Sequence, residues 1–255
     1  MKNLVITAWL AIWLTQLAAQ NVAPKDENVL RIMCYNVHNF VGMDGQRNYQ
    51  RIADVINSVA PDVVAIQEAD STTRRSAGVY TLKEVAERTD MFAVYAPAIE
   101  YQGGKYGVGI LSKTPPVAVK QYALPGREER RTLLVAEFEK YIVACTHFSL
   151  NGDDRLASVS IINNAAKGVS KPFFLAGDMN CEPDSPPQTA ILQTFTVISD
   201  VKQNTFPVVN PDQCIDYIYQ YRNGQDCAVL KSQTVNEQIA SDHLPLYVDV
   251  RLSAY

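Results

Sequence analysis

The stretch Leu-Ala-Gly-Asp-Met-Asn-Cys-Glu, residues 175–182, says more about fold and function than any other part of this chain. Its apolar start predicts the end of a buried strand, after which Asp178 and Asn180 follow two residues apart. If the strand continued through both, their side chains would lie on one face and could reach the same phosphate or water. Gly, Asp and Asn also build ordinary turns at strand ends, so this stretch alone leaves both interpretations open.

Length and composition indicate one large globular domain. Of the 255 residues, 47% are hydrophobic, which is enough to bury a substantial core. There is no Gly/Ser-rich linker or charged run, so we expect residues 29–255 to form a single domain. The formal net charge is −4, so the chain has no broad basic surface for nonspecific nucleic-acid binding, although a local positive potential could still serve a nuclease.

The first residues resemble an export signal. Met1-Lys2-Asn3 gives a positive start, Leu4–Leu14 a short apolar run, and Ala18-Ala19-Gln20 a site for cleavage after Ala19. The apolar run is shorter than the roughly 20 residues that a membrane span needs, so a retained anchor is the weaker alternative. We therefore expect residues 1–19 to be a signal peptide, the mature chain to lack a membrane span, and the protein to be periplasmic or secreted.

Five cysteines remain after that signal, an odd number for an exported domain. Cys34 and Cys145 lie in apolar runs and are expected to be packed core thiols. Cys214 and Cys227 flank a possible hairpin and could pair, while Cys181 is left over beside the acidic turn. None has a second Cys or His at zinc-ligand spacing, which argues against a structural zinc site.

Strands and helices alternate in both halves of the chain, which predicts an α/β fold. Periodicity predicts helices at 49–60, 81–88, 154–168 and 187–193, and strands at 29–35, 62–66, 92–95, 106–111, 132–138, 141–146, 172–176, 195–198, 215–219 and 246–252. The segments at 132–138 and 141–146 should form an antiparallel hairpin. We expect two mixed sheets packed face to face, with the helices outside.

Polar residues stand at the ends of these apolar strands, where an ordinary core would not need them. Each alone has a structural explanation, because Asn and Asp cap turns and a lone His is usually a hydrogen-bonded surface residue. The three histidines of the chain, however, all lie beside such a strand end. These strand-end residues are Asn36, Glu68, His147, Asp178, Asp242 and His243.

These residues occur in an order that resembles the endonuclease/exonuclease/phosphatase superfamily, which has the DNase I-like fold. The resemblance covers about residues 29–252 and rests on the ordered strings CYNVHNF, VVAIQEAD, YGVGILSK, ACTHFSL, LAGDMNCEPDS, CIDYIY and SDHLPLYV. Residues 67–78 and 101–113 further resemble a bacterial branch described as metal-dependent hydrolases. The resemblance implies a four-layer α/β sandwich and an enzyme that hydrolyses phosphoesters.

The resemblance also implies a metal site. Glu68 matches the family's metal-binding carboxylate, Asn36 would bind metal or phosphate, and Asp242 would be a metal ligand or support its neighbour His243. An all-oxygen site with few protein ligands suits Mg²⁺ or Mn²⁺ rather than zinc. His38 stands where several nucleases of the family carry an acid, so it would be a nitrogen ligand of a second metal, a substrate contact or a strand-end hydrogen bonder.

The same resemblance assigns the catalytic roles. Asp178 would orient or deprotonate the attacking water, and Asn180 would hold Asp178 or donate to a phosphoryl oxygen. His243 would contact the phosphate, with Asp216 holding its tautomer. His147 would be the general acid or a phosphate ligand.

The substrate is less determined than the chemistry. Arg74, Arg75 and Arg131 can donate to phosphate oxygens, and we expect at least one of them to face the site, with Tyr106 at its rim. The leading hypothesis is a phosphodiesterase, including an endonuclease or exonuclease. A phosphatase or phosphodiesterase acting on a small, lipid or sugar phosphate is the alternative, and an inactive phosphate-binding module is a third. No stable protein partner is implied.

Overall fold

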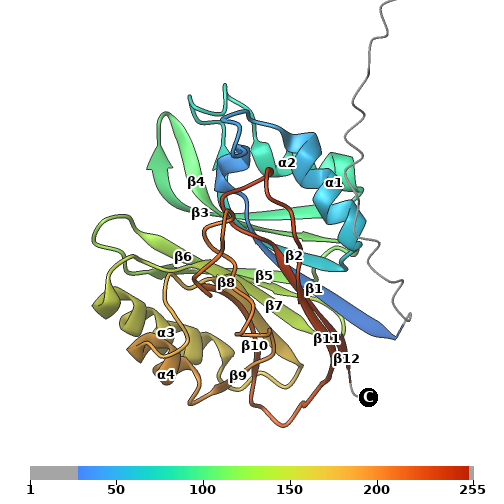
Figure 1. The fold of residues 1–255 in the computed structure, drawn as a ribbon. Coiled ribbons are helices and arrows are strands. Elements are labelled where there is room, and N and C mark those ends of the chain that lie inside the picture. The colour runs from blue at the N-terminus through green and yellow to red at the C-terminus, as the bar shows by residue number, and fades with distance from the viewer. Residues whose placement is uncertain (1–27, 253–255) are drawn as a thin grey trace, which may run out of the picture.

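The computed structural model of the protein describes residues 28–252 (Figure 1). The predicted signal peptide, residues 1–19, lies outside the described residues and stays a prediction. Twelve strands of the described chain form two six-stranded sheets, and the sequence had predicted two sheets packed face to face. Both sheets are mixed, because β1 runs parallel to β2 in one and β7 runs parallel to β8 in the other.

The first sheet places the last strand beside the first, so that β12 lies between β11 and β1. Its order is β11 (Ala228–Thr234), β12 (Leu246–Arg251), β1 (Val29–Asn36), β2 (Val63–Ser71), β4 (Gly104–Ser112) and β3 (Phe92–Tyr101). The second sheet contains the predicted hairpin as β6 and β7. Its order is β5 (Ala118–Leu124), β6 (Arg131–Glu137), β7 (Ile142–His147), β8 (Phe173–Asp178), β10 (Asp216–Tyr221) and β9 (Phe195–Val197).

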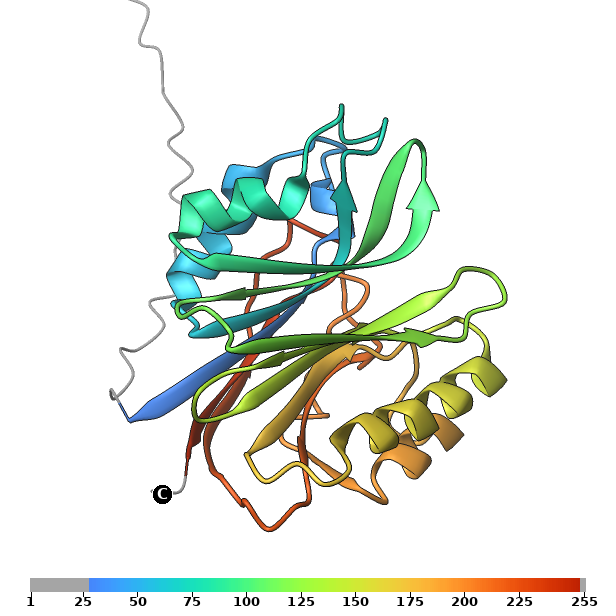
Figure 2. The same cartoon turned by 180° about the vertical axis from the view of Figure 1, so that it is seen from behind.

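Helices cover the outer face of each sheet and give the four layers that the family resemblance implied (Figure 2). The first sheet carries α1 (Tyr49–Val59) and α2 (Thr81–Thr89), and the second carries α3 (Gly152–Ala166) and α4 (Pro186–Ile191). A short 3₁₀ turn, η1 (His38–Phe40), follows β1. The fold is therefore the predicted helix–sheet–sheet–helix sandwich.

Three buried clusters hold these layers together. The central one lies between the sheets and includes Ile32 and Ile110 from the first and Phe174 and Ile218 from the second, all with no exposed surface. One outer cluster packs α1 and α2 on the first sheet, and the other packs α3 and α4 on the second. Burial of apolar side chains on both faces explains why the inner strands read as continuous apolar runs.

Two strands were missed from the sequence, and the pairing of Cys214 with Cys227 that the sequence left open does not occur. β5 and β11 are edge strands with few or no buried side chains, so they lack the alternation that marks a half-buried strand. The segment between Cys214 and Cys227 does not form a hairpin, because β10 and β11 belong to different sheets. Cys214 and Cys227 do not pair with each other, and the five cysteines form no disulfide within the described residues.

Within residues 28–252, no helix is both long and apolar enough to cross a membrane.

Candidate active site

Hydrogen bonding in the second sheet aligns three of the predicted site residues in one row. β7 pairs with β8 in parallel so that His147 lies opposite Asp178, and β10 pairs with β8 in antiparallel so that Asp216 lies opposite Asp178. Just before Asp178, Gly177 keeps the strands close, because a Cβ there would lie 2.2 Å from the Thr146 carbonyl oxygen. Asp178 therefore lies at the centre of the row.

The first sheet supplies the facing group from the ends of β1 and β2. Asn36 pairs with Gln67 in the parallel register, and Glu68 follows at a bulge where the pairing of β2 with β4 shifts. Glu68 has a φ of 62°, in the left-handed region that is strained for a residue with a side chain. Such strain is typical of functional positions, and here the bulge takes Glu68 out of the regular ladder.

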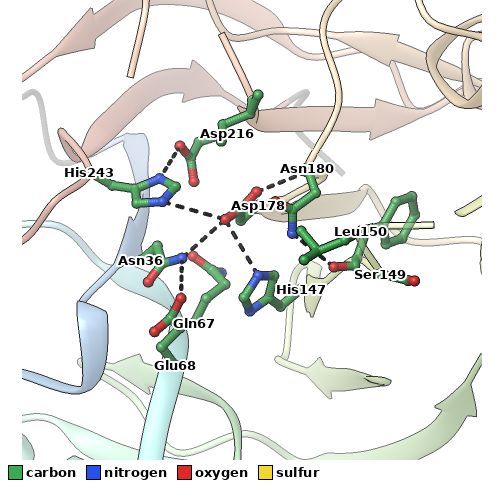
Figure 3. Close-up of polar contacts among 12 residues, drawn as sticks. Asn36, Gln67, Glu68, His147, Ser149, Leu150, Asp178, Asn180, Asp216 and His243 are labelled. Carbon is green, nitrogen blue, oxygen red and sulfur yellow. Dashed lines mark hydrogen bonds and ion pairs between the residues drawn. The ribbon is translucent and has the colours of Figure 1, made fainter. Parts of the chain in front are cut away.

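Asn36 connects the two sheets at this edge (Figure 3). Its Nδ2 lies 3.1 Å from Glu68 Oε1 and 3.0 Å from Asp178 Oδ2, so one amide group donates to carboxylates from both sheets. Ser241 Oγ donates to the Asn36 carbonyl oxygen at 2.7 Å and fixes the loop before β12 against the end of β1. The site is thus completed only when the sheets pack face to face.

His243 comes from that same loop and forms the best-defined pair of the site. Its Nδ1 lies 2.8 Å from Asp216 Oδ2, and Thr205 Oγ1 donates to the same oxygen at 2.6 Å. The Phe206 ring lies 4.7 Å from the imidazole, centroid to centroid, and limits its movement. With Nδ1 held by Asp216, Nε2 faces Asp178 Oδ2 at 3.7 Å.

His147 approaches the same oxygen from the other side. Its Nε2 lies 3.5 Å from Asp178 Oδ2, a contact between charged or polar atoms rather than a good hydrogen bond. Asp178 Oδ2 is therefore surrounded by nitrogen atoms of Asn36, His147 and His243 (Figure 3). Oδ1 of the same carboxyl accepts the Asn180 backbone N–H at 2.8 Å.

The two histidines have opposite electrostatic surroundings. Burial, together with the nearby charges of Arg131 and His243, lowers the pKa of His147 well below its usual value. Burial would lower the pKa of His243 too, but Asp216 and Asp178 outweigh it and raise that pKa to about 10. At neutral pH the site therefore holds a neutral His147 and a charged His243.

The pKa of Asp178 is also shifted from its usual value. Its complete burial, and then the nearby Asp216 carboxylate, raise the pKa of Asp178 to about 7. A carboxyl group with a pKa near neutrality can accept a proton from water and release it again at working pH. Such a shift at the convergence of several polar groups is typical of an active site.

The difference between the histidines can be measured directly. In metal-free protein with ¹⁵N-labelled histidine, we expect one buried imidazole to titrate with a pKa of about 10 and another to stay neutral well below the usual histidine pKa. The His243→Gln variant should lose the first signal and His147→Gln the second. Two buried rings that titrate together near pH 6.5 would contradict these surroundings.

Asn180 reaches the site differently from the sequence expectation. β8 ends at Asp178, and Asn180 has a φ of 49°, so the two side chains do not share a strand face. Its Nδ2 donates to the Phe148 carbonyl oxygen at 2.9 Å. The backbone N–H of Asn180 holds Asp178, as a strand-end turn would. The stretch therefore forms a turn and also places Asp178 among the other predicted site residues, while its catalytic role stays a prediction.

The donor atoms fit a divalent cation. Ligand atoms of Asp178, Asp216 and His243 lie within 4.8 Å of one another, and the Glu68 carboxylate is joined to Asp178 through the Asn36 amide, which donates to both. Asp216 Oδ1 is buried without a hydrogen-bond partner among the described residues. His243 balances the charge of only one of the two buried carboxylates, and a buried oxygen without a partner is costly, so a bound Mg²⁺ or Mn²⁺ would supply both a partner and charge.

The remaining predicted residues lie around this centre. Asp242 is 29% exposed at its side chain and lies 3.9 Å from His38 Nδ1, outside the Asp178, Asp216 and His243 group. Arg74 is exposed. Arg75 binds the buried Asp70 at 2.7 Å and packs over the Tyr101 and Tyr106 rings, so its charge is already paired.

Arg131 is the arginine that faces the site. It is only 7% exposed and lines a small cavity together with Tyr106 and His147. Tyr106 is itself buried, so it belongs to the wall of this cavity rather than to an open rim. The expectation that one of the three arginines faces the site is met by Arg131.

The sequence did not reveal the residues that hold the candidate site residues in place. Thr205 and Ser241 bind Asp216 and Asn36 from loops, and Phe206 packs on His243. Gln67, which has no exposed surface, lies between the thiols of Cys34 and Cys145 beneath the site. Only Gln67 carried a signal, since a Gln inside an apolar strand needs buried partners.

Comparison with known proteins identifies a family and a fold. The family model described as "Endonuclease/Exonuclease/phosphatase family" matches residues 33–243. No curated protein sequence matches the chain.

Three solved structures illustrate the likeness in fold. An endonuclease/exonuclease/phosphatase from Beutenbergia cavernae DSM 12333 is 23% identical with a TM-score of 0.73, over 89% of this chain and 72% of that one. A second, from Bacteroides vulgatus, is 16% identical with a TM-score of 0.73, over 88% and 99%. A mannosyl-6-phosphatase of Bacteroides thetaiotaomicron VPI-5482 is 16% identical with a TM-score of 0.67, over 87% and 99%.

Proposed function

The chain belongs to the endonuclease/exonuclease/phosphatase family, and from that premise we propose that it is an exported, divalent-metal-dependent phosphoesterase that hydrolyses phosphodiester bonds. One observation carries the proposal. The Oδ2 atom of Asp178 lies within 3.0 to 3.7 Å of nitrogen atoms from Asn36, His147 and His243. A buried carboxylate surrounded by donors is the arrangement that positions a water and an anionic ester together.

Each group has a distinct part in this chemistry. Asp178 takes the proton of the attacking water, and its pKa of about 7 suits that transfer. The charged His243 donates from Nε2 to a phosphoryl oxygen, while Asp216 holds the ring by Nδ1. His147 stays neutral, so it supports the proposal as a hydrogen-bond donor to the phosphate rather than as a charged general acid.

A metal ion completes the site. Glu68 and Asn36, with Asp178 and Asp216 next to them, are the residues that would hold Mg²⁺ or Mn²⁺. Bound there, the ion would neutralise phosphate charge and lower the pKa of water. Asp242 and His38 lie at the rim, where they would bind a second ion or the substrate. Export rests on the predicted signal peptide at residues 1–19.

Two alternatives remain for comparison. Hydrolysis of a small, lipid or sugar phosphate requires the same centre, and it is favoured by the absence of a basic stripe in a chain of pI about 5.4. An inactive phosphate-binding module is disfavoured, because it would have no need for a buried carboxyl with a pKa of about 7.

Hydrolysis of two chromogenic esters separates these functions. We expect bis-p-nitrophenyl phosphate to be hydrolysed with Mg²⁺ or Mn²⁺, faster than p-nitrophenyl phosphate, and neither to be hydrolysed in chelator. Preference for p-nitrophenyl phosphate would favour the phosphatase alternative. If neither ester is hydrolysed with either metal, the proposed function is wrong.

A further inference from the structure

A groove next to the catalytic centre has the chemistry to select the substrate. It has a volume of about 800 Å³ and lies between the end of β3 and the loop that joins β5 to β6. Both segments lie on the same side of the molecule (Figure 2). A groove of this size can hold a small organic molecule. Its polar lining residues are Glu100, Tyr101, Arg127, Glu128, Glu129 and Arg130.

The groove adjoins a small cavity beside the predicted catalytic residues. Glu129 and Ala98 line both the groove and the small cavity that contains Arg131 and His147. His147 Nε2 in turn lies 3.5 Å from Asp178 Oδ2. The groove therefore lies on the His147 side of Asp178, which is the side where the alcohol of an ester could be bound when its phosphate lies at Asp178.

Arg131 marks the inner end of this path as a place for an anion. The residue is more than nine-tenths buried, and its Nε–H has no hydrogen-bond acceptor among the described residues. Its terminal nitrogens lie 2.9 Å from Glu129 Oε1 and 3.6 Å from Glu128 Oε1. A buried guanidinium N–H without an acceptor is costly, and a phosphate oxygen would satisfy it.

The rest of the groove is unsuited to further phosphates. It contains three carboxylates and two arginines, and Arg127 is already bound to Asp154 at 3.2 Å. Of the two groove arginines, Arg130 is the one with no ion pair to another residue in the range 28–252. A polynucleotide needs a cation for most of the phosphates that it places against a protein, and three glutamates would repel them.

The same carboxylates are well arranged for hydroxyl groups. Glu128 is held in place because it accepts Ser149 Oγ at 2.9 Å and the Leu150 N–H at 2.8 Å. Glu100 is 80% exposed at its side chain and available to a ligand, with Lys105 as a loose partner at 3.5 Å. Ionised carboxylates accept strong hydrogen bonds from hydroxyl groups, and the free Arg130 can donate to hydroxyl oxygens.

We propose that this groove binds the alcohol part of the substrate and that this alcohol is uncharged and polyhydroxylated, as in a sugar phosphate, rather than a polynucleotide. The proposal rests on the proposed phosphoesterase function, because it assigns the group attached to the phosphate that Asp178 serves. It makes Glu100 and Glu128 determinants of specificity.

Matched esters test the proposal separately from the function. The diester pair is p-nitrophenyl hexose-6-phosphate and bis-p-nitrophenyl phosphate, which release the same leaving group. The monoester pair is hexose 6-phosphate and p-nitrophenyl phosphate. In whichever pair the enzyme hydrolyses, we expect kcat/KM to be at least about tenfold higher for the hexose ester, and a single-stranded oligonucleotide to be the poorest substrate.

Groove variants then show where the preference arises. Glu100→Gln combined with Glu128→Gln should reduce the hexose to p-nitrophenyl ratio about tenfold, and Glu100→Gln alone should reduce it in part. Glu139→Gln, at an exposed site outside the groove, is the matched control and should keep the ratio. Hydrolysis of p-nitrophenyl esters without a hexose preference, a better rate on the oligonucleotide, or a ratio that ignores the groove variants would overturn the proposal. Absence of all hydrolysis would instead refute the phosphoesterase function.

Discussion

Replacing Asp178 by Asn should lower kcat/KM for bis-p-nitrophenyl phosphate by about 10³-fold, because it removes the group that accepts the proton of the attacking water. The substitution keeps the shape of the side chain and can still accept the Asn180 N–H. The carboxylate also contributes to the metal-binding group, so weaker metal binding could explain part of the loss. Saturating Mg²⁺ or Mn²⁺ removes that part, and the loss caused by the missing proton acceptor should persist. The measurement is the rate at several metal concentrations.

The stability of the same variant separates chemistry from folding. Burial raises the pKa of Asp178 to about 7, so ionising it in the metal-free protein destabilises the fold increasingly as pH rises from about 4 towards 7. Asn does not ionise, so in chelator at pH 8 the variant should unfold at a higher temperature than the wild type, and this gain should shrink towards pH 5. Asp184→Asn, at an exposed position, should change neither activity nor stability. An active Asp178→Asn enzyme would refute its role.

Replacing His243 by Gln should lower kcat/KM on the order of 10²–10³-fold, because a charged donor to the phosphate is lost. Asp216→Asn should have a comparable effect, since Asp216 acts by holding His243 through Nδ1 at 2.8 Å. The double variant should lose little more than either single one, because the pair works as a unit. Losses that multiply in the double variant would contradict this coupling.

The pH dependence of the rate shows whether Asp216 acts by keeping His243 charged or only supports the fold. Asp216 helps to raise the pKa of His243 to about 10, so the wild-type enzyme should keep its His243 charge throughout pH 6–9. Without that carboxylate the pKa of His243 should be lower, so His243 should lose its charge within pH 6–9. The rate of the Asp216→Asn enzyme should therefore fall as pH rises through this range. A variant with a lower rate but the wild-type profile would mean that Asp216 only supports the fold.

Much of the site could be predicted because its residues stand at recognisable places. Asn36, His147 and Asp178 end strands that are mostly apolar, so their position at one edge of the sheets follows from the strand pattern. The opposition of Asp178 to both His147 and Asp216 could not be predicted, because register depends on how distant strands pair.

Other features were hidden because they depend on tertiary contacts. Arg74 and Arg75 are neighbours in sequence, yet only Arg75 finds the buried Asp70 and two tyrosine rings. Thr205 lies in a loop without periodicity, and nothing in its surroundings connects it with Asp216. β11 was missed because an edge strand has few buried side chains to give it a pattern.

The most direct test of the account is the rate of bis-p-nitrophenyl phosphate hydrolysis by chelator-treated protein as Mg²⁺ or Mn²⁺ is added back, for the wild type and Glu68→Gln. We predict that the wild type is inactive without metal and recovers with it. Glu68→Gln should require at least about tenfold more metal, because a metal-binding carboxylate is lost. Hydrolysis at the full rate without metal, or an unchanged metal requirement in Glu68→Gln, would contradict the account.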